Sequence, residues 1–96
     1  MTKISRTDAS KGHGTFELTI DGKPQGHLVY TVAGGQTVEI DYVEVDPSLR
    51  GQGMGKRLID AAVDWARLDG RKVQPLCSYA RAVMTRSKEY DDVLSK

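Results

Sequence analysis

The chain has 96 residues, 39% of them hydrophobic and 28% charged, which is ordinary for one globular domain and leaves no room for a second. Its 14 lysine and arginine residues nearly balance its 13 aspartate and glutamate residues, and the net charge of +1 argues against nucleic acid or an anionic membrane as a partner. One cysteine allows no internal disulfide, two histidines form no metal-ligand cluster, and the lack of a long apolar run or a leader predicts a cytoplasmic protein with no metal and no membrane span.

The first half of the chain predicts antiparallel strands joined by tight turns. Residues 1–12 show no clear pattern, and we expect them to be loosely ordered. Residues 15–20 alternate polar and apolar side chains, which predicts a half-buried strand. A turn at 21–24 leads into a second strand over 25–33. The pair Gly34-Gly35 then suits a tight hairpin into a third strand.

In the third strand, residues 37–45, the apolar side chains change faces part-way along. The residues on the first face are Val38, Ile40 and Tyr42, and those on the second are Val43 and Val45. A β-bulge would produce this change, and so would a strand buried on both faces; a strand without a bulge fits equally well. Pro47 ends the strand because it donates no hydrogen bond and restricts Asp46 to extended geometry.

The second half of the chain predicts a helix, a strand and a second helix. Residues 54–68 place apolar side chains at steps of three and four, and Gly70 stands where a helix C-cap is usual. A short strand over 72–76 and a helix from Ser78 to about Arg86 follow. The side chains expected to face the core are Leu58, Ala61, Ala62, Trp65 and Leu68 in the first helix, and Tyr79, Ala82 and Val83 in the second.

The predicted order of elements is β-β-β-α-β-α. Antiparallel hairpins come first, and one βαβ crossover then makes the last two strands parallel before a C-terminal helix. We therefore expect a minimal α+β (α/β) fold forming a single domain over residues 1–96.

The glycine-rich loop from Arg50 to Lys56, between a strand and a helix, is the strongest functional signal in the sequence. Unpaired N–H groups and the dipole at a helix N-terminus favour anions, and glycines let a phosphate approach the backbone. A P-loop would need glycine at position 50 and serine or threonine at position 57, and both hold arginine. A dinucleotide-binding loop starting at Gly51 would need its third glycine at position 56, which holds lysine.

The segment Arg50-Gly51-Gln52-Gly53-Met54-Gly55 resembles the Gln/Arg-x-x-Gly-x-Gly/Ala signature of the GNAT acetyltransferase superfamily. In that family the loop amides grip the pyrophosphate of coenzyme A, and the preceding strand, here Val43-Glu44-Val45-Asp46-Pro47, is splayed by a bulge. The resemblance implies a GNAT-like fold and acetyl-CoA as co-substrate. The residues expected to bind it are Val43, Val45, Arg50, Gly51, Gln52, Gly53, Met54, Gly55 and Lys56.

A narrower resemblance, over residues 39–94, is to short stand-alone GNAT-like proteins with a cysteine motif. The block Pro75-Leu76-Cys77-Ser78-Tyr79-Ala80-Arg81 is similar to that motif. Ser87-Lys88-Glu89-Tyr90 stands where that subfamily often has His-Pro-Glu-Tyr, and Tyr42-Val43 replaces what is often His-Thr. The second replacement argues against a catalytic histidine in that strand.

Three residues are the candidate catalytic groups. Cys77 stands where a strand joins a helix, and the helix dipole there favours a thiolate. The subfamily resemblance implies that Cys77 is catalytic, either attacking the thioester or protonating the departing thiolate; a small buried apolar residue is the alternative. Glu44 is the candidate base, acting through a water, or an exposed strand residue. Tyr79 is an alternative acid, or a core residue with its hydroxyl at the rim.

The resemblance therefore predicts an N-acetyltransferase that moves the acetyl group of acetyl-CoA to a primary amine, either a protein lysine or a small amine. A non-catalytic acyl-CoA-binding or sensor module is the alternative. We expect a monomer or a weak homodimer, with no nucleic-acid or membrane partner.

Overall fold

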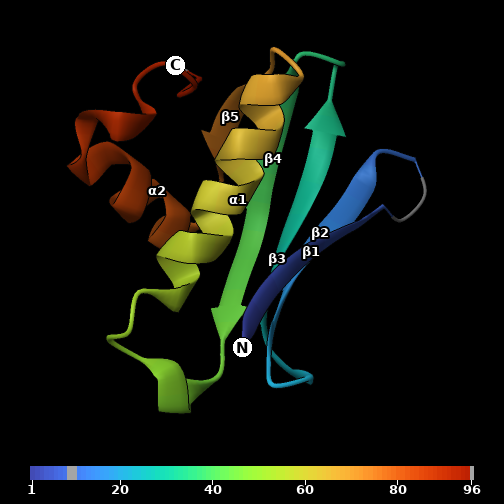
Figure 1. Ribbon diagram of the computed structural model, residues 1–96. Helices are drawn as coiled ribbons and strands as arrows, with labels where there is room; N and C mark the ends of the chain where they lie inside the picture. Colours follow the sequence, from blue (N-terminus) through green and yellow to red (C-terminus); the bar gives the residue numbers. More distant parts are fainter. Residues whose placement is uncertain (9–10, 96) are drawn as a thin grey trace.

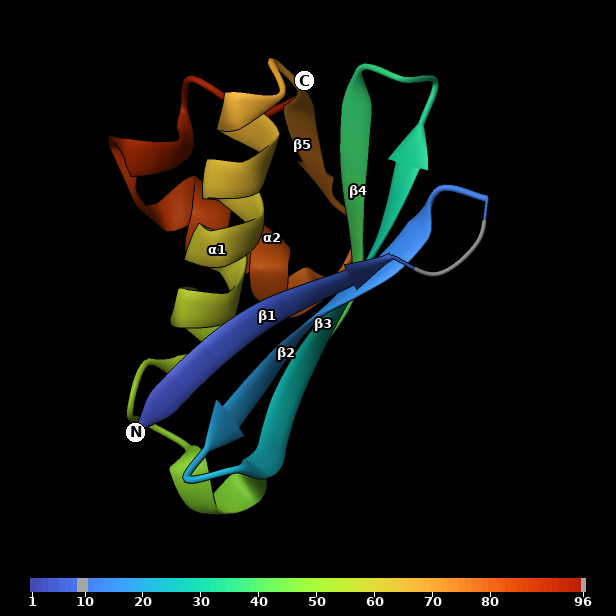
Figure 2. The same ribbon diagram turned by 45° about the vertical axis from the view of Figure 1, so that its right-hand side comes forward.

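A computed structural model describes residues 1–8 and 11–95 and shows a five-stranded sheet with two helices on one face (Figures 1 and 2). Two short 3-10 turns, Pro47–Leu49 and Lys88–Tyr90, complete the regular structure of these residues. The strands are β1 Thr2–Asp8, β2 His13–Ile20, β3 Lys23–Ala33, β4 Thr37–Val45 and β5 Lys72–Pro75, and the helices are α1 Met54–Leu68 and α2 Ser78–Arg86.

The strands lie in the sheet in chain order, from β1 to β5. Neighbours from β1 to β4 are antiparallel, whereas β5 runs parallel to β4 after the crossover through α1. This confirms the predicted mixed fold of hairpins followed by one βαβ unit and a C-terminal helix. The helix and strand bounds predicted from position 37 onward agree with the structure to within one residue.

The prediction that residues 1–12 are loosely ordered is wrong for β1, which adds a fourth strand before α1. Thr2 to Asp8 pair with β2 in continuous register, and residues 9 and 10 lie outside the described range. No apolar alternation marks this edge strand, because Ile4 is the one large apolar side chain of β1 that packs against the core. Main-chain hydrogen bonds to β2 hold β1 in the sheet. One side-chain contact adds to them, because the guanidinium of Arg6 lies 4.7 Å from the centre of the Trp65 ring.

The buried faces of the helices match the prediction only in part: Leu58, Ala62 and Val83 are buried as expected, whereas Tyr79 and Ala82 are exposed. The residues of α1 that are buried are Gly55, Leu58, Ile59, Ala62, Val63 and Ala66, and those of α2 are Ala80, Val83 and Met84. Leu68 was expected in the core but is 89% exposed, and Trp65 is half-buried beside Phe16 and Tyr30. Several overlapping apolar stripes exist on α1, and contact with the twisted sheet decides between them.

The bulge interpretation of β4 is confirmed. Val29 pairs with Tyr42 and Tyr30 pairs with Ile40, which leaves Asp41 as the extra residue. The bulge lets Ile40 and Val43 both pack towards the core, while Tyr42 turns to the opposite face of the sheet. The side-chain parity change in the sequence is therefore this irregularity in the backbone.

The pairing of β4 with β5 ends where the bulge begins. It covers residues 37–40 of β4 only, and the carbonyl of Ile40 accepts hydrogen bonds from the N–H groups of Leu76 (3.0 Å) and Cys77 (3.2 Å). Beyond Ile40 the chain of β5 turns into α2, whereas β4 runs on to Val45. A gap in the sheet opens beside the second half of β4, at the same end as the glycine loop.

Candidate functional site

A cleft of about 430 Å³ lies between the end of β4, the glycine loop and the first turns of the two helices. Its floor is the second half of β4, and its wall is the start of α1 with Tyr79 of α2. The lining residues are Val43, Glu44, Val45, Pro47, Leu49, Arg50, Gly51, Gly53, Met54, Gly55 and Tyr79.

The loop holds two glycines in a conformation that other residues rarely adopt. Gly51 and Gly53 have φ values of 78° and 74°, in the left-handed region, and a Cβ at either position would meet nothing within 4 Å. Glycine at these two positions therefore allows the left-handed backbone conformation and leaves the space above the loop open. Close internal packing is not the reason for either glycine.

Gly53 is also the N-cap of α1, and it fixes where the free N–H groups point. The first hydrogen bond of the helix runs from the N–H of Arg57 to the carbonyl of Gly53, at 3.1 Å. Within the described residues, the N–H groups of Met54, Gly55 and Lys56 come before that bond and have no hydrogen-bond partner. Donors at the positive end of a 15-residue helix, beside an open cleft, form a site suited to an anion.

Nine of the twelve predicted site residues line the cleft, and three do not. The side chain of Gln52 donates to the carbonyl of Ser48 (3.4 Å) and stays with the loop. The ammonium of Lys56 points to the C-terminal segment, 2.9 Å from a carboxylate oxygen of Glu89 and 3.1 Å from Asp60. The bond to Glu89 is the largest of the contacts that raise the pKa of Lys56.

Cys77 is the third predicted residue outside the cleft lining. It is half-buried against the core at the N-cap of α2, and its side chain makes no capping bond. Tyr79, two residues on, does face the cleft, with its ring over Gly55 and 43% of its surface exposed. Of the three predicted catalytic groups, the structure brings Glu44 and Tyr79 to the same cleft.

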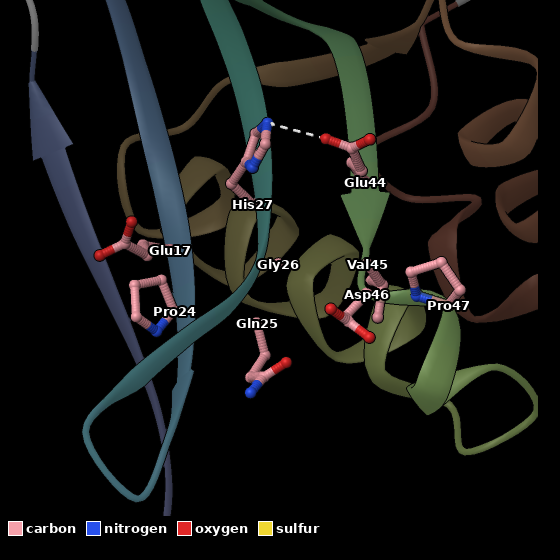
Figure 3. A pocket seen from close by; sticks show the side chains of 9 residues that line it. All are labelled: Glu17, Pro24, Gln25, Gly26, His27, Glu44, Val45, Asp46 and Pro47. Carbon is pink, nitrogen blue, oxygen red and sulfur yellow. Dashed lines mark ion pairs between the residues drawn. The ribbon is translucent and has the colours of Figure 1, made fainter.

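A second hollow, of about 270 Å³, lies beside Glu44 near the turn between β2 and β3 (Figure 3). Here the side chain of Glu44 points to His27 of β3, with 3.8 Å between Oε1 and Nε2. The ring centres of His27 and Tyr42 are 5.6 Å apart, and the neighbouring Glu44 raises the pKa of the Tyr42 phenol. No sequence motif around His27 indicates a role; the register of the β3–β4 hairpin, which pairs it with Glu44, is the signal that could have found it.

Across residues 1–8 and 11–95, no three His, Cys, Asp or Glu side chains come together as a metal site would require. None of the helices in these ranges has the length and apolar character needed to cross a membrane.

The sequence of the chain is similar to those of known proteins. A family model described as GCN5-related N-acetyl-transferase matches residues 15–93. An uncharacterized N-acetyltransferase of Methanocaldococcus jannaschii is 32% identical over 69 residues, which cover 66% of this chain and 30% of that protein. The chain thus spans about a third of the length of this relative.

Solved structures share the fold. A GCN5-like protein of Staphylococcus aureus, solved by NMR, is 26% identical with a TM-score of 0.73, over 97% of this chain and 87% of that one. A GNAT family acetyltransferase of Elizabethkingia anophelis, solved with acetyl-CoA bound, is 14% identical with a TM-score of 0.72, over 88% of this chain and 72% of that one. Because the family model covers most of the chain, the protein belongs to the GCN5-related N-acetyltransferase family.

Proposed function

We propose that this protein binds acetyl-CoA in the cleft and transfers the acetyl group to a primary amine, on a protein lysine or on a small amine, in the cytoplasm and as a monomer or weak homodimer. The observation that carries the proposal is the row of unpartnered N–H groups at the start of α1, held open to the cleft by Gly51 and Gly53. They would hold the pyrophosphate of the coenzyme, and the guanidinium of Arg50 would add a positive charge beside it.

The second half of β4 suits the extended arm of the coenzyme. Residues 41–45 pair with β3 on one side, and within the described residues β5 does not continue the ladder on the other. The main-chain groups of Val43 and Val45 on that side are free to bond the amides of the arm, as an added strand would. The acetyl-CoA in the Elizabethkingia structure, which has this fold, supports the same assignment.

The catalytic roles follow from where the side chains lie. We assign Glu44, at the boundary of the cleft, to the base, and Tyr79, across the cleft, to the acid that protonates the departing thiolate. Cys77 would act as nucleophile or acid only after a side-chain movement, because it does not line the cleft in this structure.

The test is to mix the protein with acetyl-CoA and a panel of peptides and polyamines, then map the acetylated products by mass spectrometry. A thermal scan runs in parallel. At free acetyl-CoA of about 100 times Kd, binding stabilises the native state by roughly 2.7 kcal/mol, which raises Tm by several degrees in a domain of this size. If Tm does not rise when acetyl-CoA is added, the proposal of a coenzyme site is overturned.

The rival function is a module that binds acyl-CoA and catalyses no transfer. The position of Cys77 outside the cleft lining favours this rival, since it leaves the predicted nucleophile unused. A thermal shift without any acetylated product, over the whole panel, would support the rival function.

A further inference from the structure

The face of the sheet opposite the helices carries a row of polar side chains in register. Figures 1 and 2 show from two directions that both helices lie on the same face of the sheet. On the other face, Glu17 of β2 pairs with His27 of β3, and His27 pairs with Glu44 of β4. A carboxylate therefore flanks the imidazole on each side, on a face that no helix covers.

This row opens into the hollow near the β2–β3 turn. Figure 3 shows His27 and Glu44 turned towards each other, with Glu17 on one side and Asp46 on the other. Three residues that line the hollow, Glu44, Val45 and Pro47, also line the proposed coenzyme cleft. These shared residues form the wall between the two spaces, so a molecule in the hollow lies against the same end of β4 as a molecule in the cleft.

We propose that the acceptor amine enters through this hollow, from the helix-free face, and that His27 is the catalytic residue that takes its proton. Glu44, assigned above to the base, then acts through the neighbouring His27 and does not take the proton from the amine itself. The inference rests on the proposed acetyl transfer and deepens it. His27 lies on a different strand from the predicted catalytic residues, and it is accessible, with 39% of its side chain exposed.

The proton and bond changes balance as follows. The acceptor arrives as an alkylammonium ion and gives one proton to the imidazole of His27, which becomes an imidazolium beside Glu44. The neutral nitrogen then forms a bond to the acetyl carbon, and the bond from that carbon to sulfur breaks. The second proton lost by the nitrogen is matched by the one that converts the coenzyme thiolate to a thiol. The products are the amide, free coenzyme A and protonated His27, which returns its proton to water.

The groups that surround His27 are mostly carboxylates, which suits a cationic acceptor. Glu17 faces it from β2, Tyr42 and Glu44 face it from β4, and Asp46 lies on the rim of the hollow. The hollow is lined by three carboxylates and by no lysine or arginine. This negative lining attracts a cationic amine and disfavours an anionic acceptor. A lysine side chain and a polyamine share the required alkylammonium group.

The decisive experiment uses the full chain and compares His27→Gln with His13→Gln. His13, the other histidine, lies on β2 with Nδ1 3.1 Å from the hydroxyl of Thr31 and does not line the hollow. Acetyl transfer to Nα-acetyl-lysine amide and to spermidine is measured from pH 5 to 9. His27→Gln should lower kcat about 100-fold or more and change the pH profile of kcat. His13→Gln should retain both, and added imidazole should partly restore a His27→Ala variant.

A binding measurement keeps the inference testable if neither acceptor is turned over. The ring signals of the two histidines are followed by NMR while spermidine or Nα-acetyl-lysine amide is added. Signals of His27 that shift, while those of His13 stay unchanged, support the hollow as the amine site. The inference is overturned if His27 does not respond, or if wild-type protein transfers acetyl groups and His27→Gln does so equally well. Failure of the proposed function differs, because it is the absence of acetyl-CoA binding by every variant.

Discussion

The phenol ring of Tyr79 lies directly over the Cα of Gly55, so that a Cβ at position 55 would stand 2.5 Å from the Tyr79 hydroxyl and 2.8 Å from its Cε2. Gly55 is therefore the contact between the start of α1 and the start of α2. It sets the height at which the Tyr79 hydroxyl stands in the cleft, and so the position of the proposed acid.

Gly55→Ala should displace Tyr79 without unfolding the protein. The ring is 43% exposed and can swing outward, and alanine favours a helix over glycine by about 1 kcal/mol, so Tm should change little. If Tyr79 is the acid, transfer should fall about 10-fold or more. A double-mutant cycle with Tyr79→Phe, measuring kcat and Tm, checks this. If the double variant lowers kcat by the product of the two single effects, Gly55 does not act through Tyr79 and this account is contradicted.

Gly53→Val should abolish coenzyme A binding. The valine must adopt a φ near 74°, at a cost of about 1–2 kcal/mol, and its branched side chain would occupy the open space above the loop. Gly34→Val is the matched control, since Gly34 has a φ of 63° and an equally open surrounding in the distant β3–β4 turn. Calorimetry should show lost binding for the first variant and unchanged binding for the second. Intact affinity in folded Gly53→Val would sink the loop assignment.

Two experiments on Cys77 distinguish a nucleophile from a general acid. If it is a nucleophile, acetyl-CoA alone should add one acetyl group, ~42 Da, to the peptide that contains it, labile to hydroxylamine as a thioester is. If it is an acid, no adduct forms, but Cys77→Ala should still slow transfer by roughly 10²–10⁴. Coenzyme A affinity should be unchanged in both cases. Wild-type turnover by folded Cys77→Ala would leave Cys77 as a packing residue and Glu44 with Tyr79 as the pair to test.

The C-terminal segment should loosen in acid. Both carboxylate oxygens of Asp92 accept from the guanidinium of Arg67, at 2.9 Å each, and this contact lowers the pKa of Asp92 from 3.8. A lowered folded-state pKa stabilises the protein above the unfolded value, and the contribution is lost as pH falls below about 4. Asp92→Asn should therefore lower Tm slightly at pH 7, and this effect should shrink as the pH falls below about 4. Asp91→Asn is the control, because within the described residues the Asp91 carboxylate has no ion pair. A Tm difference that does not change with pH would contradict this account.

Local periodicity predicted most of the fold, because it records which side of an element is buried. The alternation in 37–45 and the helical spacing in 54–68 gave bounds that the structure reproduces. The edge strand β1 escaped prediction because it is held mainly by main-chain pairing, which leaves little trace in side-chain type. The buried faces of the helices depend on contacts with distant strands, which is why Leu68 was misplaced.

The same distinction applies to the site. The glycine loop is contiguous in sequence, so its residues could be found together. Lys56 was expected to face the coenzyme, but its side-chain partner Glu89 lies 33 positions away and only folding brings them together. His27 reaches Glu44 because the hairpin register sets that pairing, and the bulge at Asp41 decides which later residues of β4 share its face. No pattern around His27 itself carries that information.

The gap between β4 and β5 has a consequence for the protein when its ligand is absent. Residues 41–45 present one side of a strand without a ladder partner in the described part of the chain, and such an edge can pair with another molecule. A bound coenzyme arm would cover this edge. On gentle heating at high concentration, the empty protein should therefore aggregate sooner than the loaded one.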